Sequence, residues 1–198
     1  MVDIPTNIVE KTQGFTGRVW LLPKLREWSV DPKDHLLLVT GDPGCGKSTF
    51  MAWLAGAGQS PRDTEARSQL EHIRRRIKAI HFCRSGSGNT APGSFAQSVA
   101  AQLTRAVPGY SEALAATLPE RLQISVLQQI GTVNTAAQVT GVSIGHLDFG
   151  SIDDEVSFDR FIRAPLKRLY RAGDFAESLI LLVDALDEAA RFWREAYL

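Results

Sequence analysis

One stretch of the sequence has the residue types and the spacing that are needed to hold a chain of phosphates. It fits the pattern G-x-x-x-x-G-K-[ST] at every fixed position and consists of Gly41, Asp42, Pro43, Gly44, Cys45, Gly46, Lys47, Ser48 and Thr49. Glycines let backbone N–H groups converge on phosphate oxygens, because they carry no Cβ and tolerate positive φ. A helix that begins directly after the loop adds its unpaired N–H groups and its dipole. We therefore predict that this loop binds a nucleoside triphosphate.

Three side chains of the loop have predicted roles in binding and chemistry. The Lys47 ammonium would place a positive charge on the β- and γ-phosphates, and the Ser48 hydroxyl would ligate Mg²⁺. Thr49 adds a further hydroxyl near the phosphates. The competing interpretation is a fortuitous glycine-rich turn, which we reject because a second motif follows much later in the chain.

The second motif places acidic side chains at the end of an apolar run. Residues 179–183 are apolar and are followed by Asp184, and then by Asp187 and Glu188. A continuous apolar run indicates a strand buried on both faces, so an ionised acid at its end must face solvent or a cation. We expect Asp184 to hold Mg²⁺ opposite Ser48, and Asp187 or Glu188 to orient the attacking water. The alternatives are a strand-end cap for Asp184 and helix N-terminal acids for the other two residues.

Strands and helices must position these two motifs. The apolar run 35–40 ahead of the loop is predicted to be a buried parallel strand, and residues 48–55 behind the loop a helix. A helix that begins near Pro23 is expected to pack on the sheet through Trp20 and Trp28. Other helices are expected at 64–76, 92–107, 111–118 and 156–171, and other strands at 77–83 and 179–184.

Three further segments carry weaker patterns. Residues 1–13 are expected to be an extended lead-in, and residues 122–149 a hairpin or extended insert. Pro165 is expected to kink the helix at 156–171 or to end its first half. The basic run 72–78 could be a nucleic-acid patch, but a solvated helix end is the better account, because cations are favoured near a helix C-terminus.

Composition excludes several classes of partner. The 198 residues carry 22 basic and 22 acidic side chains, so the zero net charge gives no electrostatic case for nucleic acid or membranes. Cys45 and Cys83 show no disulfide framework, which favours a reducing, cytoplasmic setting. No apolar run reaches membrane-spanning length, and no secretory signal is visible. We therefore expect a cytoplasmic protein without a membrane partner.

Taken together, the motifs resemble those of the STAND-class P-loop NTPases and, within them, the NACHT-like domains. Three stretches carry the resemblance: Phe-Thr-Gly-Arg at 15–18, the loop at 41–49, and residues 181–188, where a small residue and then two further acids follow Asp184. The resemblance implies an α/β fold, namely the three-layer α/β/α P-loop NTPase fold with a mainly parallel sheet. The domain would span residues 14–198, after the lead-in at 1–13.

The resemblance also implies a function. It implies that Phe15 and Arg18 lie near the adenine, and that ATP with Mg²⁺ switches the module between a closed monomer and an oligomer. Turnover would be slow, because the nucleotide state is the output. The family's domain continues past the Walker B strand that ends at Asp184, so we expect an incomplete sheet at the C-terminus and interpret the chain as the N-terminal portion of the module.

Three functions stay open at this point. The first is a signalling ATPase whose Lys47, Ser48 and Asp184 bind Mg-ATP and whose Asp187 or Glu188 assists hydrolysis. The second is an ATP-binding interaction module without turnover. The third is a kinase or a nucleic-acid motor, although the neutral charge argues against a motor. The absence of an Asn-Lys-x-Asp segment favours ATP over GTP, so the expected partners are ATP or ADP and a second copy of the module.

Overall fold

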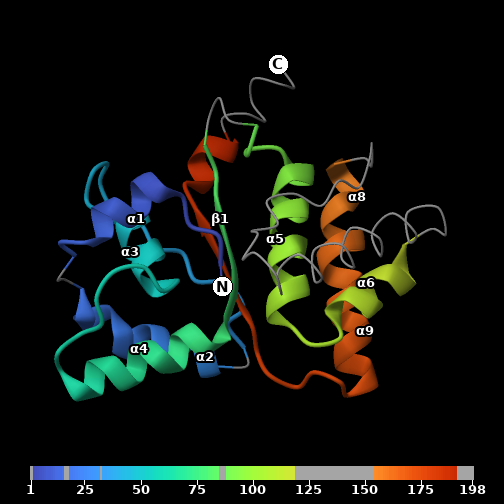
Figure 1. Cartoon of the computed structure of the whole chain (residues 1–198), viewed down its shortest axis with the longest axis horizontal. Coiled ribbons are helices and arrows are strands. Elements are labelled where there is room, and N and C mark those ends of the chain that lie inside the picture. The colour runs from blue at the N-terminus through green and yellow to red at the C-terminus, as the bar shows by residue number, and fades with distance from the viewer. Residues whose placement is uncertain (1, 16–17, 32, 85–87, 119–153, 191–198) are drawn as a thin grey trace, which may run out of the picture. The chain divides into compact units, whose positions relative to one another are not determined.

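Helices and a two-stranded parallel sheet make up the part of the chain that the structure describes (Figure 1). The structure is a computed structural model, and it describes residues 2–15, 18–31, 33–84, 88–118 and 154–190. The chain divides into two compact units. We call Val2–Ile80 with Glu177–Asp184 the loop unit, because it contains residues 41–49, and we call His81–Ala176 with Ala185–Leu198 the helical unit. The predicted α/β class is confirmed in this mixed, mostly helical form.

The loop unit contains the two strands and the helices on which the candidate site depends. Its elements are α1 (Thr6–Thr12), the 3₁₀ turn η1 (Val19–Leu21), α2 (Leu22–Val30), α3 (Lys47–Leu54), α4 (Thr64–Arg76), most of β1 (Ile77–Phe82) and β2 (Ile180–Asp184). The expected helices at 64–76 and near Pro23 are confirmed, with Pro23 in the first turn of α2. The expected strands at 77–83 and 179–184 are confirmed as β1 and β2. No helix in the described ranges is both long and apolar enough to cross a membrane.

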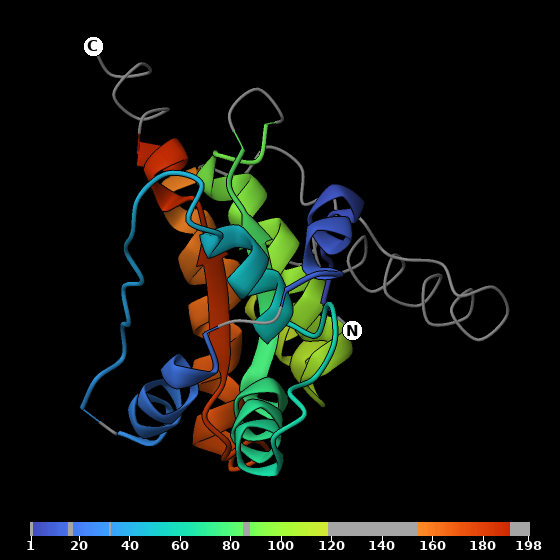
Figure 2. The same ribbon diagram turned by 90° about the vertical axis from the view of Figure 1, so that its left-hand side faces the viewer.

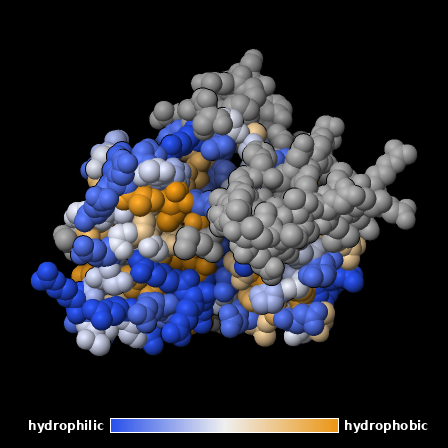
Figure 3. Space-filling model, viewed as in Figure 1, coloured by the Kyte–Doolittle hydropathy of each residue, from blue (hydrophilic) through white to orange (hydrophobic). Residues whose placement is uncertain are grey.

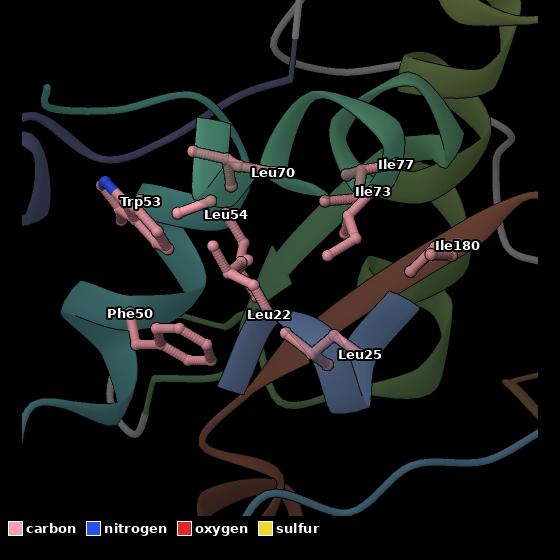
Figure 4. Close-up of a cluster of buried hydrophobic side chains, with 10 residues drawn as sticks. Leu22, Leu25, Phe50, Trp53, Leu54, Leu70, Ile73, Ile77 and Ile180 are labelled. Atoms are coloured by element: carbon pink, nitrogen blue, oxygen red, sulfur yellow. The ribbon is translucent and has the colours of Figure 1, made fainter. Parts of the chain in front are cut away.

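A single cluster of apolar side chains holds the loop unit together (Figure 4). Helices α2, α3 and α4 and the two strands all contribute to it through Leu22, Leu25, Phe50, Trp53, Leu54, Ala66, Leu70, Ile73, Ile77 and Ile180. Figure 4 shows these side chains pointing toward one another between the helices. Each fully buried large side chain contributes ~1.5–3 kcal/mol, so this cluster determines where α3 begins and ends.

The first helix corrects one expectation. Residues 6–12 form α1 and are not extended, because a helix lets Ile8 and Thr12 become buried on the same side. Helix α1 packs on α3. Gly58, in the segment that follows α3, lets this segment pass close to the end of α1. A Cβ at position 58 would lie 2.9 Å from the Thr12 carbonyl oxygen.

The run 35–40 is the largest departure from the sequence-based expectation. These residues form no strand, and the predicted buried segment is exposed, with Leu36 at 85% and Leu38 at 71% of full exposure. Figure 2 shows the chain ahead of α3 running by itself along the outside of the loop unit. A strand exists only when a neighbour supplies hydrogen bonds, and the described strands β1 and β2 pair with each other. The expectation of a buried strand is therefore wrong for this structure.

The two tryptophans near α2 have different environments. Trp20 is 64% exposed, so the expectation that it packs on the sheet is wrong. Trp28 is half-buried against the apolar cluster. Its ring Nε1 is buried, and no acceptor for it exists among the described residues.

Helix α4 joins the other two helices of the cluster through its last turn. The Arg74 guanidinium donates to the Trp53 carbonyl at 2.6 Å and to the Leu54 carbonyl at 3.3 Å, at the C-terminus of α3. Arg76 donates to the Ser29 hydroxyl at 3.1 Å, in the last turn of α2. Unpaired carbonyls at a helix end attract cations, so these two arginines satisfy helix ends. The expectation of a solvated helix end is therefore wrong for Arg74 and Arg76.

The N-terminus of α4 follows a local rule. Asp63 is the N-cap residue, and its carboxylate accepts from the Ala66 N–H at 2.8 Å.

At the other end of α4, burial lowers the pKa of Arg74, an effect that the negative charge of Glu71 partly offsets. The guanidinium is thus desolvated, and its helix-end carbonyls take the place of water.

The role of Arg74 predicts a specific loss of stability. Arg74→Met keeps the apolar stem but removes the hydrogen bonds to α3, and we expect a loss of ~1.5–3 kcal/mol in the free energy of unfolding. Urea unfolding of the full chain measures this change. The exposed neighbour gives the matched control, and Arg75→Met is expected to change the free energy by less than ~0.5 kcal/mol. Equal effects of the two substitutions would contradict the capping role.

The helical unit consists of helices on both sides of residues 119–153, which lie outside the described part. Its elements are α5 (Pro92–Ala106), α6 (Tyr110–Thr117), α8 (Asp154–Phe158), the π-helical turn η2 (Asp159–Arg163) and α9 (Ala164–Ala172). Helix α5 packs on α8 and η2, and α6 packs on α9. The expected helices at 92–107, 111–118 and 156–171 are confirmed. The expected insert at 122–149 falls within residues 119–153.

Proline changes the geometry of the last long helical stretch, as expected. Pro165 lies in the first turn of α9, directly after the π-helical turn η2. A proline lacks the N–H that would bond to the carbonyl four residues earlier, which here is the carbonyl of Phe161. The buried Tyr110 hydroxyl of α6 donates to this carbonyl. Burial raises the pKa of Tyr110, so its hydroxyl keeps the proton that it donates.

This contact predicts the effect of removing a single oxygen atom. Tyr110→Phe is expected to reduce the free energy of unfolding by ~1–3 kcal/mol, because the hydrogen bond between two buried groups is lost. Thermal or urea unfolding measures the change. Tyr170→Phe is the matched control, since at 42% exposure water can replace what the hydroxyl loses. An unchanged stability of Tyr110→Phe would show that the hydroxyl does not support the helix at Pro165.

Candidate nucleotide-binding site

The phosphate-loop pattern adopts a tight turn that ends at a helix N-terminus. Gly44 and Gly46 have φ of 76° and 86°, in the left-handed region, and Gly46 is the N-cap residue of α3. Cys45 N–H donates to the Asp42 carbonyl at 3.2 Å. The first bond of α3 runs from Phe50 N–H to the Gly46 carbonyl at 3.0 Å. The N–H groups ahead of Phe50 therefore have no intrahelical partner, which is the arrangement that attracts an anion.

The Lys47 side chain donates hydrogen bonds to backbone carbonyls at the start of its own loop. Its ammonium donates to the Gly41 carbonyl at 2.7 Å and to the Asp42 carbonyl at 3.1 Å. A Cβ at position 41 would lie 2.9 Å from the Cys45 sulfur, so a larger residue there would require that side chain to move. The ammonium is thus held over the loop by carbonyl groups, where an incoming phosphate would compete for it.

Phe15 and Arg18 contact the loop and α3. Arg18 donates to the Cys45 carbonyl, and its guanidinium lies 5.9 Å from the centre of the Phe50 ring. The Phe15 ring packs at 5.5 Å from the Trp53 ring and at 6.3 Å from the Phe50 ring. The structure therefore brings Arg18 to the phosphate loop, while it gives the Phe15 ring a packing role against α3.

Strained backbone occurs at two of the motifs. Within the described ranges, the non-glycine residues with positive φ are Arg18, at 71°, and Ala185, at 56°. Each belongs to a stretch that carries the NACHT-like resemblance. Such conformations cost roughly 1–3 kcal/mol and cluster at functional sites. The strain is therefore an independent reason to examine both stretches as parts of a site.

Asp184 ends β2 in the same unit as the loop. It is only 6% exposed, and no described residue forms a hydrogen bond or an ion pair with its carboxylate. Strand β2 contacts α3, whose first turn carries the half-buried Ser48. An ionised acid at the end of a strand must face a polar group, solvent or a cation. The carboxylate and the Ser48 hydroxyl are oxygen ligands of the kind that Mg²⁺ prefers.

The other two acids belong to the helical unit. Asp187 is exposed and Glu188 is half-buried, and Glu188 N–H donates to the Ala185 carbonyl at 2.9 Å. They follow Asp184 closely in the sequence, but the division into units separates them from the loop. Their roles toward the attacking water stay predictions.

Sequence reasoning missed two parts of the site's support. One is the aromatic group of Phe15, Phe50 and Trp53, whose rings stack behind the loop. The other is Arg74, which caps α3 at its far end. The spacing of Phe50 and Trp53 at i and i+3 in the expected helix was a usable signal for the first. No local pattern distinguishes Arg74 from Arg75.

Comparison with known protein families adds an independent observation. The family model described as nephrocystin 3, N-terminal, matches residues 17–138, which is more than half of the chain. The chain belongs to the nephrocystin 3 N-terminal family. This family is related to the NACHT-like NTPases, so the resemblance is confirmed at the level of the family. No significant match was found among curated proteins or among solved structures.

The nephrocystin 3 N-terminal match covers one half of the candidate site. It contains Arg18, the complete loop at 41–49, and α4 with Arg74. It ends before Asp184 and the two acids that follow. The match therefore includes the loop and Arg74 without assigning them a role, and the assignment of the acids rests on the sequence pattern and on the burial of Asp184.

The left-handed backbone of the loop predicts a cost for adding one methyl group. Gly46→Ala leaves room for the Cβ, since the nearest atom is the Arg18 guanidinium at 3.7 Å. The cost therefore comes only from the left-handed backbone, which a residue with a Cβ adopts less readily than glycine. We expect a loss of roughly 1–2 kcal/mol in the free energy of unfolding. Gly14→Ala is the matched control, because no atom lies within 4 Å of the added Cβ and its backbone is not left-handed. Equal stability of the two variants in urea would argue against the turn described here.

Proposed function

We propose that the chain is a nucleotide-binding signalling module of the NACHT type, which binds Mg-ATP and hydrolyses it slowly as a switch. The observation that carries this proposal is the loop geometry. Two left-handed glycines, Gly44 and Gly46, lead into the N-terminus of α3, and Lys47 stands over the loop. This arrangement offers N–H donors and one cation to a phosphate chain.

The residues available for a metal ion fit magnesium. Ser48 and Asp184 offer a hydroxyl and a carboxylate, both hard oxygen ligands. Ser48 and Asp184 would hold the ion, which would supply positive charge to offset the charge that develops during phosphoryl transfer. The low exposure of Asp184 supports the assignment, because a mostly buried carboxylate favours a neighbouring cation.

The chain's own groups would act in sequence. Incoming phosphates would take the Lys47 ammonium from the Gly41 and Asp42 carbonyls, and Thr49 would add a hydroxyl contact. Arg18 would contribute a second positive charge from the loop side, since it already donates to the Cys45 carbonyl. Asp187 or Glu188 would hold the attacking water and accept its proton. The slow turnover is part of the proposal, because a switch must keep its nucleotide long enough to signal.

The finer fold and the cellular setting belong to the same proposal. We place β1 and β2 in a three-layer α/β/α P-loop arrangement with a mainly parallel sheet. We also place the module in the cytoplasm, with ATP or ADP and a second copy of the module as partners. Both cysteines are free, and Cys45 is exposed, which fits a reducing compartment.

Calorimetry on the full chain tests the proposal. Wild-type protein is expected to bind ATP in the presence of Mg²⁺, and Lys47→Ala is expected to weaken binding at least roughly tenfold, because a charge-assisted contact is lost. Lys33→Ala is the matched control, since this exposed lysine lies ahead of the loop and its side chain makes no contact with it. A folded wild-type chain that binds no Mg-ATP would overturn the proposal.

Measurement of ATP hydrolysis distinguishes the proposed switch from an ATP-binding module without turnover. Glu188→Gln and Asp187→Asn are expected to retain ATP binding, and the one that orients the water should lose hydrolysis. Binding by wild type without any phosphate release would favour the alternative function, an ATP-binding interaction module without turnover. Hydrolysis that survives Lys47→Ala would contradict the proposed role of the loop.

A further inference from the structure

We propose that a group of basic side chains shared by α2 and α4 binds a phosphate-type dianion at a second site, separate from the nucleotide loop. The group consists of Arg26 on α2 and of His72, Arg75 and Arg76 on α4, and we call it the basic corner. Helices α2 and α4 pack on each other within the loop unit. The surface around α4 is mostly hydrophilic in Figure 3.

One contact in the basic corner is unusual. Nη1 of Arg76 lies 2.5 Å from Nε2 of His72. A guanidinium is always a donor, so the imidazole Nε2 must accept and the ring must be neutral. The same Nη1 lies 3.1 Å from the Ser29 hydroxyl of α2. The titratable ring of His72 thus lies next to the permanent positive charge of Arg76. An anion would be the more favourable neighbour for this guanidinium.

The charges around the ring are all of one sign. The pKa of His72 is lowered first by burial, and then by the positive charges of Arg76, Arg26 and Arg75. Arg26 comes from the neighbouring helix, and the other two come from α4 itself. No carboxylate of the described residues forms an ion pair with Arg26 or Arg75. This concentration of positive charge contrasts with the zero net charge of the chain.

Phosphate chemistry matches these groups. The planar forks of arginine side chains bind phosphate oxygens in pairs, and the bonds are charge-assisted. A bound dianion would reverse the field at the His72 ring, so its pKa would rise from the lowered value. The ring would then take up a proton at Nε2, end its contact with Arg76 and become a donor to the anion. Binding of the anion should therefore be coupled to the uptake of a proton by His72.

The expected anion is a phosphate group, and two sources share this chemistry. One is a free phosphate or pyrophosphate, and the other is a phosphate ester on a lipid headgroup. Neither requires Mg²⁺, since the site offers cations and no carboxylate. This independence of metal separates the basic corner from the proposed nucleotide site.

Histidine NMR on the full chain tests the site directly. The His72 ring signal is followed over pH with inorganic phosphate and, separately, with chloride at the same ionic strength. We expect phosphate to raise the pKa of His72 while chloride leaves it unchanged. Arg26→Gln and Arg75→Gln should each weaken phosphate binding by roughly tenfold, because each removes a charge-assisted contact.

Two control variants make the result specific. Arg62→Gln removes an exposed charge ahead of α4 and should leave the His72 shift intact. Lys47→Ala disables the proposed nucleotide loop and should also leave it intact. Loss of the shift in Lys47→Ala, or an equal shift with chloride, would overturn the proposal, as would the absence of any shift.

Vesicles carrying a phosphatidylinositol phosphate distinguish the two sources. Co-sedimentation that is lost in Arg26→Gln and Arg75→Gln would identify a lipid headgroup as the source. The absence of co-sedimentation, together with the phosphate-induced shift of His72, would identify the free anion. Failure of Mg-ATP binding in calorimetry would leave this site unaffected, so the two proposals can fail separately.

Discussion

The position of helix α3 is the constraint on which the loop unit depends. Its N-terminus follows the left-handed Gly46, and its C-terminal carbonyls accept from Arg74 of α4. Between these ends, Phe50 and Trp53 are buried in the apolar cluster. A phosphate-binding loop is useful only when the helix behind it cannot shift, because its N–H groups must point at one place. The capping arginine and the aromatic rings hold α3 in place and would therefore support the proposed site.

The positively charged side chains of the loop unit make different kinds of contact. Lys47 and Arg18 lie on the loop carbonyls, and Arg74 satisfies the end of α3. Arg76 contacts both Ser29, in the last turn of α2, and His72. A chain with no net charge can thus contain local regions of positive potential, because a net charge is a sum that does not say where the charges lie. Net charge alone is a poor guide to anion binding here.

The helical unit shows how a backbone defect is compensated at a distance. Pro165 removes a donor from its own helix, and the Tyr110 hydroxyl replaces it from a position 51 residues away from Phe161 in the sequence. The hydroxyl is buried, so the exchange takes place without water, where an unsatisfied carbonyl would be most costly. The strained residues Arg18 and Ala185 are a different case, since their cost stands beside the candidate site.

The sequence by itself determined the features that depend on neighbouring residues. The positive φ of the loop glycines Gly44 and Gly46 could be predicted, because the allowed φ values of a residue are a local property. Strands β1 and β2 could be predicted from their apolar runs, and the family resemblance from the loop and the acids that follow β2.

Only the tertiary structure decided which predicted elements find partners. The run 35–40 is as apolar as β2 but lacks a paired neighbour, and a strand requires one. Trp20 is exposed while Trp28 is half-buried, although the first lies directly ahead of α2 and the second within it. Arg74, Arg75 and Arg76 are identical in type and adjacent in sequence, yet one caps α3, one is exposed and one contacts α2. The physical reason is that burial and hydrogen bonding depend on segments distant in sequence, which local patterns do not specify.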